Sequence, residues 1–173
     1  MANWVIDNSH SHIDFSVRHM VFAKVRGAFR KWNAQLALAE DLASSTVNVE
    51  VEVASIDTGE EKRDGHLRSA DFFDAETHPK MTFASKRIDK TQGTLLVVGD
   101  LTIHGVTKEV ALDVEETGRG KDPWGNERVG FSAKTSINRA DYGLTWNAAL
   151  ETGGVLVGEK VEISIEVEAV KQA

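Results

Sequence analysis

Apolar and polar residues alternate with a period of two through most of this chain. In residues 47–53, valines alternate with Asn48, Glu50 and Glu52, and residues 161–168 repeat the pattern near the other end of the chain. A β-strand points successive side chains to opposite faces of its sheet, so each segment predicts a strand with one apolar and one charged face. An antiparallel sheet can leave its polar face in water but must bury the other face.

The chain contains about eight long runs of this kind, which we expect to form one antiparallel sheet. The runs cover residues 11–18, 25–38, 46–56, 80–88, 94–104, 106–116, 128–138 and 158–170. In the second run the apolar phase shifts between Phe29 and Trp32, which predicts a β-bulge. Closing eight strands into a barrel removes exposed edges and leaves an interior wide enough for side chains or one small ligand. We therefore predict an all-β protein, an eight-stranded antiparallel β-barrel formed by a single domain over residues 1–173.

A helical insertion interrupts the strands in mid-chain. Thr58 followed by Glu61 matches a capping box, which predicts a short surface helix over residues 60–69. Phe72 and Phe73 follow this helix before the strands resume. Connections of roughly twenty residues are longer than hairpin loops and are often functional, so we expect this insertion to cover an opening of the barrel as a lid.

The net charge of −7 and the absence of cysteine exclude several classes of function. A protein that binds nucleic acid or docks on anionic lipid surfaces normally presents a basic face, so we expect neither partner. Without cysteine there is no disulfide, thiolate nucleophile or Cys-ligated metal. The first residues lack the basic and apolar regions of a secretory signal, and no apolar run is long enough to span a membrane. We expect a cytoplasmic protein, or a periplasmic one if the chain is a mature form.

One group of residues has the composition of a metal site. His10, His12 and Asp14 alternate along the chain, so a strand places them on one face, and two histidines with a carboxylate can bind a metal. Apolar residues occupy the opposite face of that strand. The trio is therefore expected to be solvent-exposed polar surface, and we expect no metal or other cofactor.

His19 differs from these histidines because it shares the apolar phase of its strand and stands at the strand end. It either orients a ligand head at the mouth of the interior or serves as a hydrogen-bonded structural histidine. The chain lacks the Gly-x-Ser-x-Gly nucleophile motif and has no glycine-rich loop in the context of a nucleotide site. We expect no catalytic residue.

The aromatic and methionine residues of the strands fit either a filled core or an elongated apolar pocket. Periodicity alone does not separate a filled barrel from a hollow one. Gly27, Gly99 and Ala133 lie at positions that we expect to face inward, and such small residues favour a cavity.

Four segments resemble motifs of the YceI-like polyisoprenoid-binding family, and they occur in the same order. They are SHIDFSVRHM (residues 11–20), HLRSADFFD (66–74) with PKMTF (79–83), GDLTIHGVTK (99–108) and INRADYGL (137–144). The resemblance as a whole extends over nearly the entire chain.

This resemblance implies a lipocalin-like barrel, a homodimer, and a long amphiphile such as a polyisoprenoid or a fatty-acid-like lipid as ligand. It implies the following ligand-binding residues, in the interior, at its mouth or in the insertion: Ile13, Phe15, Val17, His19, Met20, Phe29, Phe72, Phe73, Met81, Phe83, Leu101, Ile103, Leu112 and Phe131. Arg139 and Asp141 match the last motif, where we expect a structural ion pair.

Three functions are consistent with these features. A lipid carrier or storage protein without catalysis needs a hollow apolar interior that is open at one end. An enzyme that uses the barrel as a substrate tunnel needs an acid, base or metal, supplied by His19 or by the face of His10, His12 and Asp14. A filled barrel, acting as an interaction or stress-related structural protein, needs interior side chains bulky enough to fill the space. We expect the first function.

Overall fold

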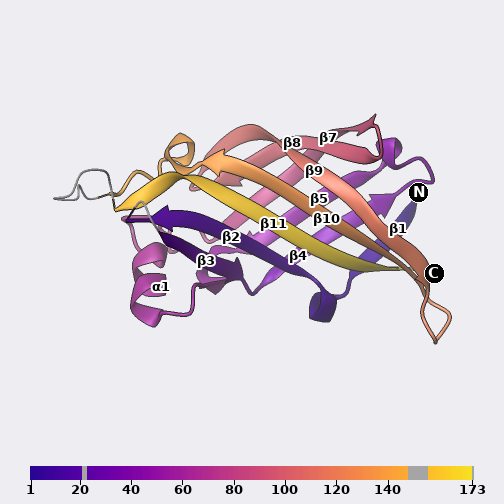
Figure 1. The fold of residues 1–173 in the computed structure, drawn as a ribbon, viewed down its shortest axis with the longest axis horizontal. Helices are drawn as coiled ribbons and strands as arrows, with labels where there is room; N and C mark the ends of the chain where they lie inside the picture. The colour runs from indigo at the N-terminus through magenta and orange to yellow at the C-terminus, as the bar shows by residue number, and fades with distance from the viewer. Residues whose placement is uncertain (21–22, 148–155, 173) are drawn as a thin grey trace.

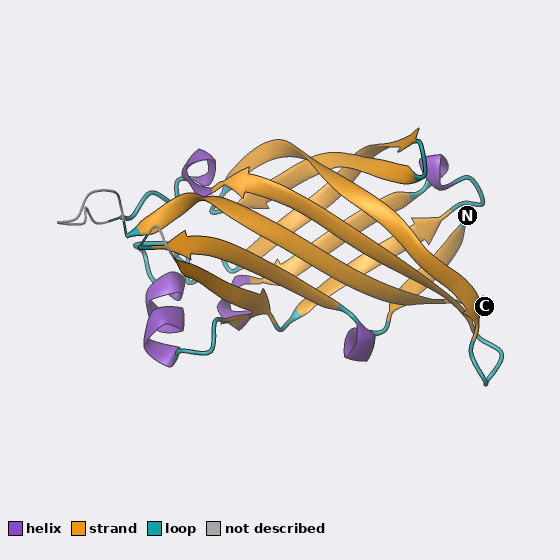
Figure 2. Ribbon diagram, viewed as in Figure 1, coloured by secondary structure: helices purple, strands orange, loops and turns teal. Residues whose placement is uncertain are grey.

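The computed structural model describes residues 1–20, 23–147 and 156–172. Antiparallel β-strands make up most of these ranges (Figures 1 and 2). The strands are β1 (Ala2–Ile6), β2 (His12–His19), β3 (Ala23–Phe29), β4 (Trp32–Leu38), β5 (Thr46–Glu52), β6 (Ile56–Asp57), β7 (Lys80–Thr91), β8 (Thr94–Ile103), β9 (Val106–Lys121), β10 (Glu127–Asn138) and β11 (Val157–Lys171). The helical elements are α1 (Glu61–Arg68) and the short 3-10 helices η1 (Asn8–His10), η2 (Leu42–Ser44), η3 (Val53–Ser55) and η4 (Arg139–Tyr142). No helix in the described ranges is long and apolar enough to cross a membrane.

The sheet closes on itself through eight of these strands. Their order around the ring is β1–β4–β5–β7–β8–β9–β10–β11, and neighbouring strands are antiparallel. The ring closes where Trp4 and Ile6 of β1 lie opposite Lys171 and Ala169 of β11. The short strands β2, β3 and β6 extend the sheet from the N-terminal part of β11. The structure confirms the predicted all-β, eight-stranded antiparallel barrel with its helical insertion. The ring uses β1 in place of the run predicted over residues 11–18, which is β2 and lies outside the ring.

The register between strands places apolar side chains opposite one another on the inner face. In β5 and β7, Val49 lies opposite Phe83 and Val51 lies opposite Met81. Glu50, between the two valines, is exposed on the outer face. Because a slip of one residue would turn every apolar side chain outward, the alternation itself specifies this register.

The segment predicted as one strand over residues 25–38 is two strands, so the predicted β-bulge is wrong. The chain bends at Arg30 and Lys31, after which β4 pairs with β1 and β5, whereas β3 pairs with β2 and β6. The Arg30 N–H donates to the Ser55 carbonyl oxygen at 3.1 Å, which anchors the bend. A bend and a bulge shift the apolar phase in the same way, so the pattern alone does not separate them.

Helix α1 begins later than the predicted capping box requires. Its N-cap is Glu60, whose carboxylate accepts a hydrogen bond from the Arg63 N–H. Thr58 instead donates from its N–H and its hydroxyl to the carboxylate of the buried Asp64. Gly59, with φ of +83°, turns the chain between Thr58 and the helix. The prediction of Thr58 as N-cap is therefore wrong, while the short helix itself is confirmed.

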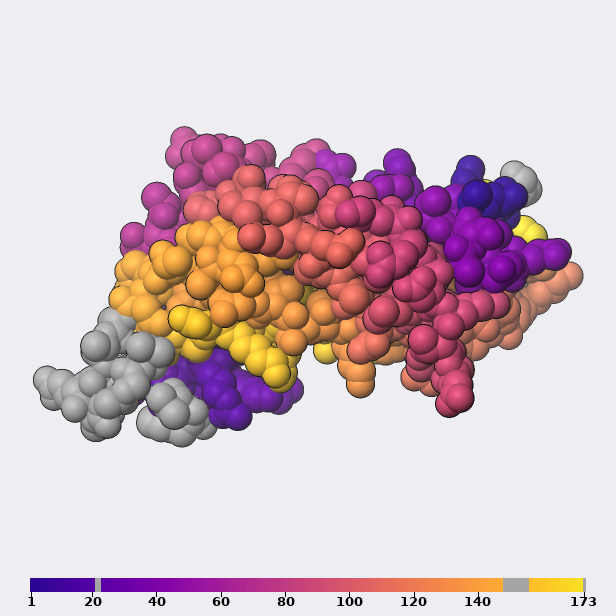
Figure 3. All heavy atoms as spheres, turned by 90° about the horizontal axis from the view of Figure 1, so that it is seen from above, coloured from indigo at the N-terminus to yellow at the C-terminus, as the bar shows by residue number. Residues whose placement is uncertain are grey.

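The barrel is elongated, with both chain termini at one end and α1 at the other (Figures 1 and 3). A cluster of buried side chains fills the interior at the terminal end: Trp4, Ile6, Ala34, Leu36, Leu38, Val129 and Ala169. A second cluster adjoins it through shared contacts with Val49 and Phe131, and consists of Phe83, Ile88, Val97 and Val114. The buried side chains at the terminal end therefore pack directly against one another.

Candidate functional site

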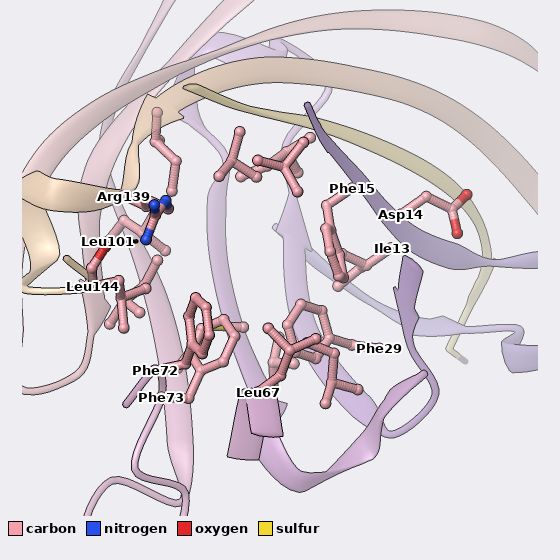
Figure 4. A pocket seen from close by; sticks show the side chains of 18 of the residues that line it. Ile13, Asp14, Phe15, Phe29, Leu67, Phe72, Phe73, Leu101, Arg139 and Leu144 are labelled. Atoms are coloured by element: carbon pink, nitrogen blue, oxygen red, sulfur yellow. Dashed lines mark hydrogen bonds between the residues drawn. The ribbon is translucent and has the colours of Figure 1, made fainter. Parts of the chain in front are cut away.

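A cavity of about 300 Å³ occupies the end of the barrel beside α1. Apolar side chains from the inner face of the strands line it, and Figure 4 shows Phe15, Phe29 and Leu101 converging on the same space. Each of these residues stands on the apolar phase of its strand, so the alternation that specifies the barrel also specifies the cavity wall. The interior is hollow at this end, whereas buried side chains pack against one another at the other end.

Twelve of the predicted ligand-binding residues line this cavity: Ile13, Phe15, Val17, His19, Phe29, Phe72, Phe73, Met81, Phe83, Leu101, Ile103 and Leu112. Met20 and Phe131 lie outside the lining. Met20 follows β2 in a left-handed conformation, with φ of +54°, and is 37% exposed. Phe131 packs against the clusters at the terminal end of the barrel. Ligand contact by the twelve residues stays a prediction, but they surround a single space.

The glycines expected to open the interior instead accommodate aromatic rings. A Cβ atom at Gly27 would lie 2.5 Å from the Phe15 ring, and one at Gly99 would lie 2.6 Å from the Phe83 ring. Ala133 packs against the cluster around Phe83 and is not part of the lining. The cavity that these small residues favour is present, but the space beside the two glycines is occupied by phenylalanine rings and not by the cavity.

The insertion covers the cavity with an aromatic cluster. The Phe73 ring packs edge-on against Phe29 of β3, with ring centroids 6.1 Å apart. The Phe72 ring lies 5.1 Å from the His66 ring and 5.3 Å from the Trp146 ring, and the His66 and Trp146 rings are 4.8 Å apart. These contacts join α1 and the segment after it to the chain that follows η4. The aromatic cluster therefore lies between α1 and the cavity wall.

Arg139, the first residue of η4, lies in the cavity wall and is only 5% exposed. Its guanidinium donates to four carbonyl oxygens, those of Leu144 at 2.7 Å, Gly158 at 2.8 Å, Trp146 at 3.0 Å and Val157 at 3.2 Å. Figure 4 shows the side chain pointing inward toward Leu144. Burial lowers the pKa of the guanidinium, because desolvation disfavours its charged form.

The predicted ion pair between Arg139 and Asp141 is wrong. The Arg139 side chain enters the barrel, whereas Asp141 is exposed on η4. The hydrogen bonds of Arg139 within the described part of the chain go to neutral carbonyl oxygens. The guanidinium also lies 5.8 Å from the centroid of the Phe72 ring, a cation–π distance. Arg139 therefore joins the start of β11, the chain after η4 and the insertion.

Basic side chains gather around the α1 end of the cavity. Those in its lining are Arg18, His19, Arg63, His66 and Arg139. Arg63 donates to the hydroxyl and carbonyl oxygens of Thr58, and His66 pairs with Asp71 at 2.9 Å. Asp14 also borders the cavity, but its carboxylate points away from it (Figure 4). Three arginines therefore border this end of the cavity, although the whole chain carries a charge of −7.

His19 ends β2 opposite Ala23 and Val157, and it lines the cavity. The apolar phase of the strand predicts such an inward position. Whether it orients a ligand head stays a prediction.

The structure does not bring His10, His12 and Asp14 together into one site. His10 belongs to η1, and its Nδ1 lies 2.9 Å from the Asp7 carboxylate. The hydrogen bond to Asp7 is the main cause that raises the pKa of His10. His12 pairs with Asp14 on the outer side of β2. The trio is polar surface, as the simpler interpretation predicts.

Sequence reasoning misses part of the cavity wall. Val161, Ile163 and Ile165 of β11 line the cavity, and their alternation with polar residues is a sufficient signal to find them. His66 and Trp146 have no such signal, because one stands on a short polar helix and the other in irregular chain. Only tertiary packing brings these two rings to the same place.

Comparison with known proteins assigns the chain to a family. The model of the YceI-like domain matches residues 4–169. A UPF0312 protein of Staphylococcus epidermidis is 42% identical over 170 residues, which is 97% of this chain and 97% of that protein. The crystal structure of BcnA from Burkholderia cenocepacia superposes with a TM-score of 0.82 at 25% identity, covering 94% of this chain and 98% of BcnA.

A second solved structure has the same fold at low sequence identity. It is described as a polyisoprenoid binding domain from Saccharophagus degradans, implicated in plant cell wall breakdown. It superposes with a TM-score of 0.72 at 15% identity, and the superposition covers 99% of this chain and 100% of that domain. With the family model and the staphylococcal relative taken together, the chain belongs to the YceI-like family.

Proposed function

We propose that the protein binds a long-chain amphiphile, with the apolar tail in the barrel and the polar head at the α1 end. The observation that supports this most strongly is the cavity of about 300 Å³, which has apolar walls along its length and basic side chains at one end. Ligand pockets typically combine predominantly apolar walls with a few placed polar groups. A polyisoprenoid or a fatty-acid-like lipid has the matching distribution of polarity.

Burial of the tail supplies the driving force for binding. Each buried methylene contributes about 0.8 kcal/mol, so about ten of them contribute about 8 kcal/mol. That free energy corresponds to a dissociation constant of about 1 μM before the cost of association is subtracted. One methylene more or less discriminates poorly between ligands, so we expect the cavity to accept a class of lipids rather than one compound.

The polar head is proposed to lie near Arg63 and Arg139. Both guanidinium groups donate to neutral oxygens of the protein, and no ion pair joins either of them to a described carboxylate, so an anionic head would give them an oppositely charged partner. Arg63 is exposed on α1 and borders the cavity, which suits it to a head that stays partly in water. A carboxylate or a phosphate has the chemistry that this end favours.

The physiological role that we propose is a carrier or store of such a lipid, without a catalytic step. The description of the Saccharophagus degradans domain supports polyisoprenoids as one ligand class for this fold. The homodimer and the cytoplasmic location stay predictions.

Native mass spectrometry of the purified protein, followed by organic extraction and lipid identification, tests the proposal. We expect a co-purifying amphiphile at one per chain, or its uptake on incubation with polyprenyl compounds and fatty acids. A mass that stays that of the bare chain under both conditions would overturn the proposal.

A matched pair of variants locates the lipid. Val161 of β11 lines the cavity, and its neighbour Lys160 is exposed with its side chain on the outer face. Val161→Trp places an indole in the proposed tail site, so we expect it to reduce lipid uptake at least tenfold, whereas Lys160→Trp leaves uptake unchanged. Equal uptake by both variants would mean that the lipid binds elsewhere.

A further inference from the structure

A second cluster with distinct chemistry lies beside the insertion, outside the lining of the cavity. Asp74 and His78 belong to the segment between α1 and β7, and His104 lies in the turn between β8 and β9. One ligand atom from each of the three side chains lies within 4.8 Å of the other two. All three residues are partly buried, so the cluster is sheltered but accessible.

The hydrogen bonding of His104 prepares this residue to bind a metal. Its Nδ1 lies 3.1 Å from the Tyr142 carbonyl oxygen, which can only accept, so Nδ1 carries the proton. The lone pair of the neutral ring is then on Nε2. Metal-binding histidines commonly donate their other ring N–H to a carbonyl or a carboxylate in this way, which fixes the tautomer and the orientation of the ring.

The backbone conformation around the cluster is also consistent with a metal site. Asp74 and His104 have φ of +48° and +56°, a region that residues other than glycine rarely occupy, and which is often found where function constrains the chain. The ring of His78 lies 4.9 Å from that of His104 and packs over Gly105, where an added Cβ would come within 3.0 Å of His78 Cε1. Glycine at 105 leaves the space that the His78 ring occupies.

In a second cluster of histidine and carboxylate side chains, an arginine of the protein already neutralises the carboxylates. Asp7, His10 and Glu168 also lie close together, but the Arg128 guanidinium sits 2.9 Å from both carboxylates. A divalent cation would have to displace this arginine. Within the described residues, by contrast, the carboxylate of Asp74 has no hydrogen-bond or ion-pair partner.

We propose that Asp74, His78 and His104 form a binding site for a first-row divalent transition metal, with Zn²⁺ as the reference ion. Two imidazoles and one carboxylate are a common set of three protein ligands for zinc, with a further position left for water or another ligand. Ligand atoms around tetrahedral zinc lie about 3.4 Å apart, so side-chain rotation must draw the three groups together. A bound ion joins the segment carrying Phe72 and Phe73 to the β8–β9 turn, and so fastens the insertion to the barrel.

The test uses untagged protein, free of added histidines, and titration calorimetry with Zn²⁺ alone. We expect one ion per chain in the wild-type protein. Asp74→Asn and His104→Asn retain a residue that tolerates positive φ, and His78→Gln retains the size of a polar side chain, so the variants are expected to fold. Each should weaken zinc binding at least tenfold, while His10→Gln, in the cluster that contains Arg128, should bind within twofold of wild type.

A second readout is the thermal unfolding midpoint, which zinc should raise in the wild-type protein and not in the three variants. The proposal is overturned if the wild-type chain fails to bind zinc up to millimolar concentration. It is also overturned if the three variants bind zinc as tightly as the wild-type protein, whatever the affinity of His10→Gln. The measurement needs no lipid, so it stands or falls separately from the proposed lipid binding.

Discussion

Arg139 gives the sharpest test of how the end of the barrel beside α1 is held together. Replacing it by methionine retains an apolar stem of similar length and removes the four hydrogen bonds that the guanidinium donates to carbonyl oxygens. At about 1 kcal/mol net for each bond, the loss is about 4 kcal/mol. Removing the buried charge also removes its desolvation penalty, which offsets part of the loss. We therefore expect the free energy of unfolding to fall by about 3 kcal/mol. For a chain of this length the thermal midpoint should drop by about 9 °C.

Urea denaturation measures this change directly, with an unchanged dependence on denaturant showing that the native state keeps its compactness. Asp141→Asn is the matched control. If Arg139 acts through the four carbonyl groups, Asp141→Asn should alter stability by less than about 0.5 kcal/mol, as an ordinary surface change does. The reasoning is refuted if Arg139→Met is as stable as wild type, or if Asp141→Asn destabilises the protein as much as Arg139→Met does.

Three further predictions follow from the same geometry. Gly99→Leu should destabilise the protein by more than about 3 kcal/mol in urea denaturation. The reason is that an added Cβ would lie 2.6 Å from the Phe83 ring and 2.4 Å from the Ala84 carbonyl oxygen. Unchanged stability would contradict this packing. The Arg128 guanidinium lowers the pKa of Asp122 to about 2, below its ordinary value of 3.8, so the stability from this pair is present above pH about 4 and lost as the pH falls toward about 2. Urea midpoints measured across this pH range should fall more steeply for wild type than for Arg128→Gln, and parallel curves would show that the pair does not contribute. Phe72→Ala opens the aromatic cluster over the cavity, so it should speed the release of a bound fluorescent fatty acid about tenfold in stopped-flow displacement. Phe131→Ala, at the terminal end of the barrel, should lower stability without changing the release rate. Equal release rates for the two variants would rule out the lid.

The alternation of apolar and polar residues predicts most of the barrel, because it determines for every residue of a strand whether the side chain faces inward or outward. Val49 and Val51 face inward beside Phe83 and Met81 as their phase requires. The alternation does not show where a strand bends, because the change of phase near residues 30 and 31 has the same form in a bend and in a bulge. The different strand partners of β3 and β4, and the hydrogen bond from Arg30 to Ser55 at the bend, involve segments distant in the chain.

The candidate site is predictable to the extent that it consists of strand residues. Phe15 and Leu101 follow from their phase, and the family resemblance points to Phe72 and Phe73 in the insertion. The role of Arg139 does not follow from sequence, because its four partners are backbone carbonyls, which carry no residue-specific signal.

The surroundings of the two glycines and of His66 also do not follow from the sequence. A glycine at an inward position is compatible with an open space or with a ring packed over the strand, and both Gly27 and Gly99 turn out to accommodate rings. His66 joins Phe72 and Trp146 only because α1 packs against the chain after η4. Such contacts between elements are a property of the folded chain.

The hollow end of the barrel is the proposed lipid site. The most direct measurement is a crystal structure of the protein after incubation with a long-chain fatty acid or polyprenyl phosphate. We expect continuous electron density for a chain running between Phe15 and Leu101, with its polar end beside Arg63. Density for the lipid only on the outer surface, with the cavity free of it, would contradict the claim.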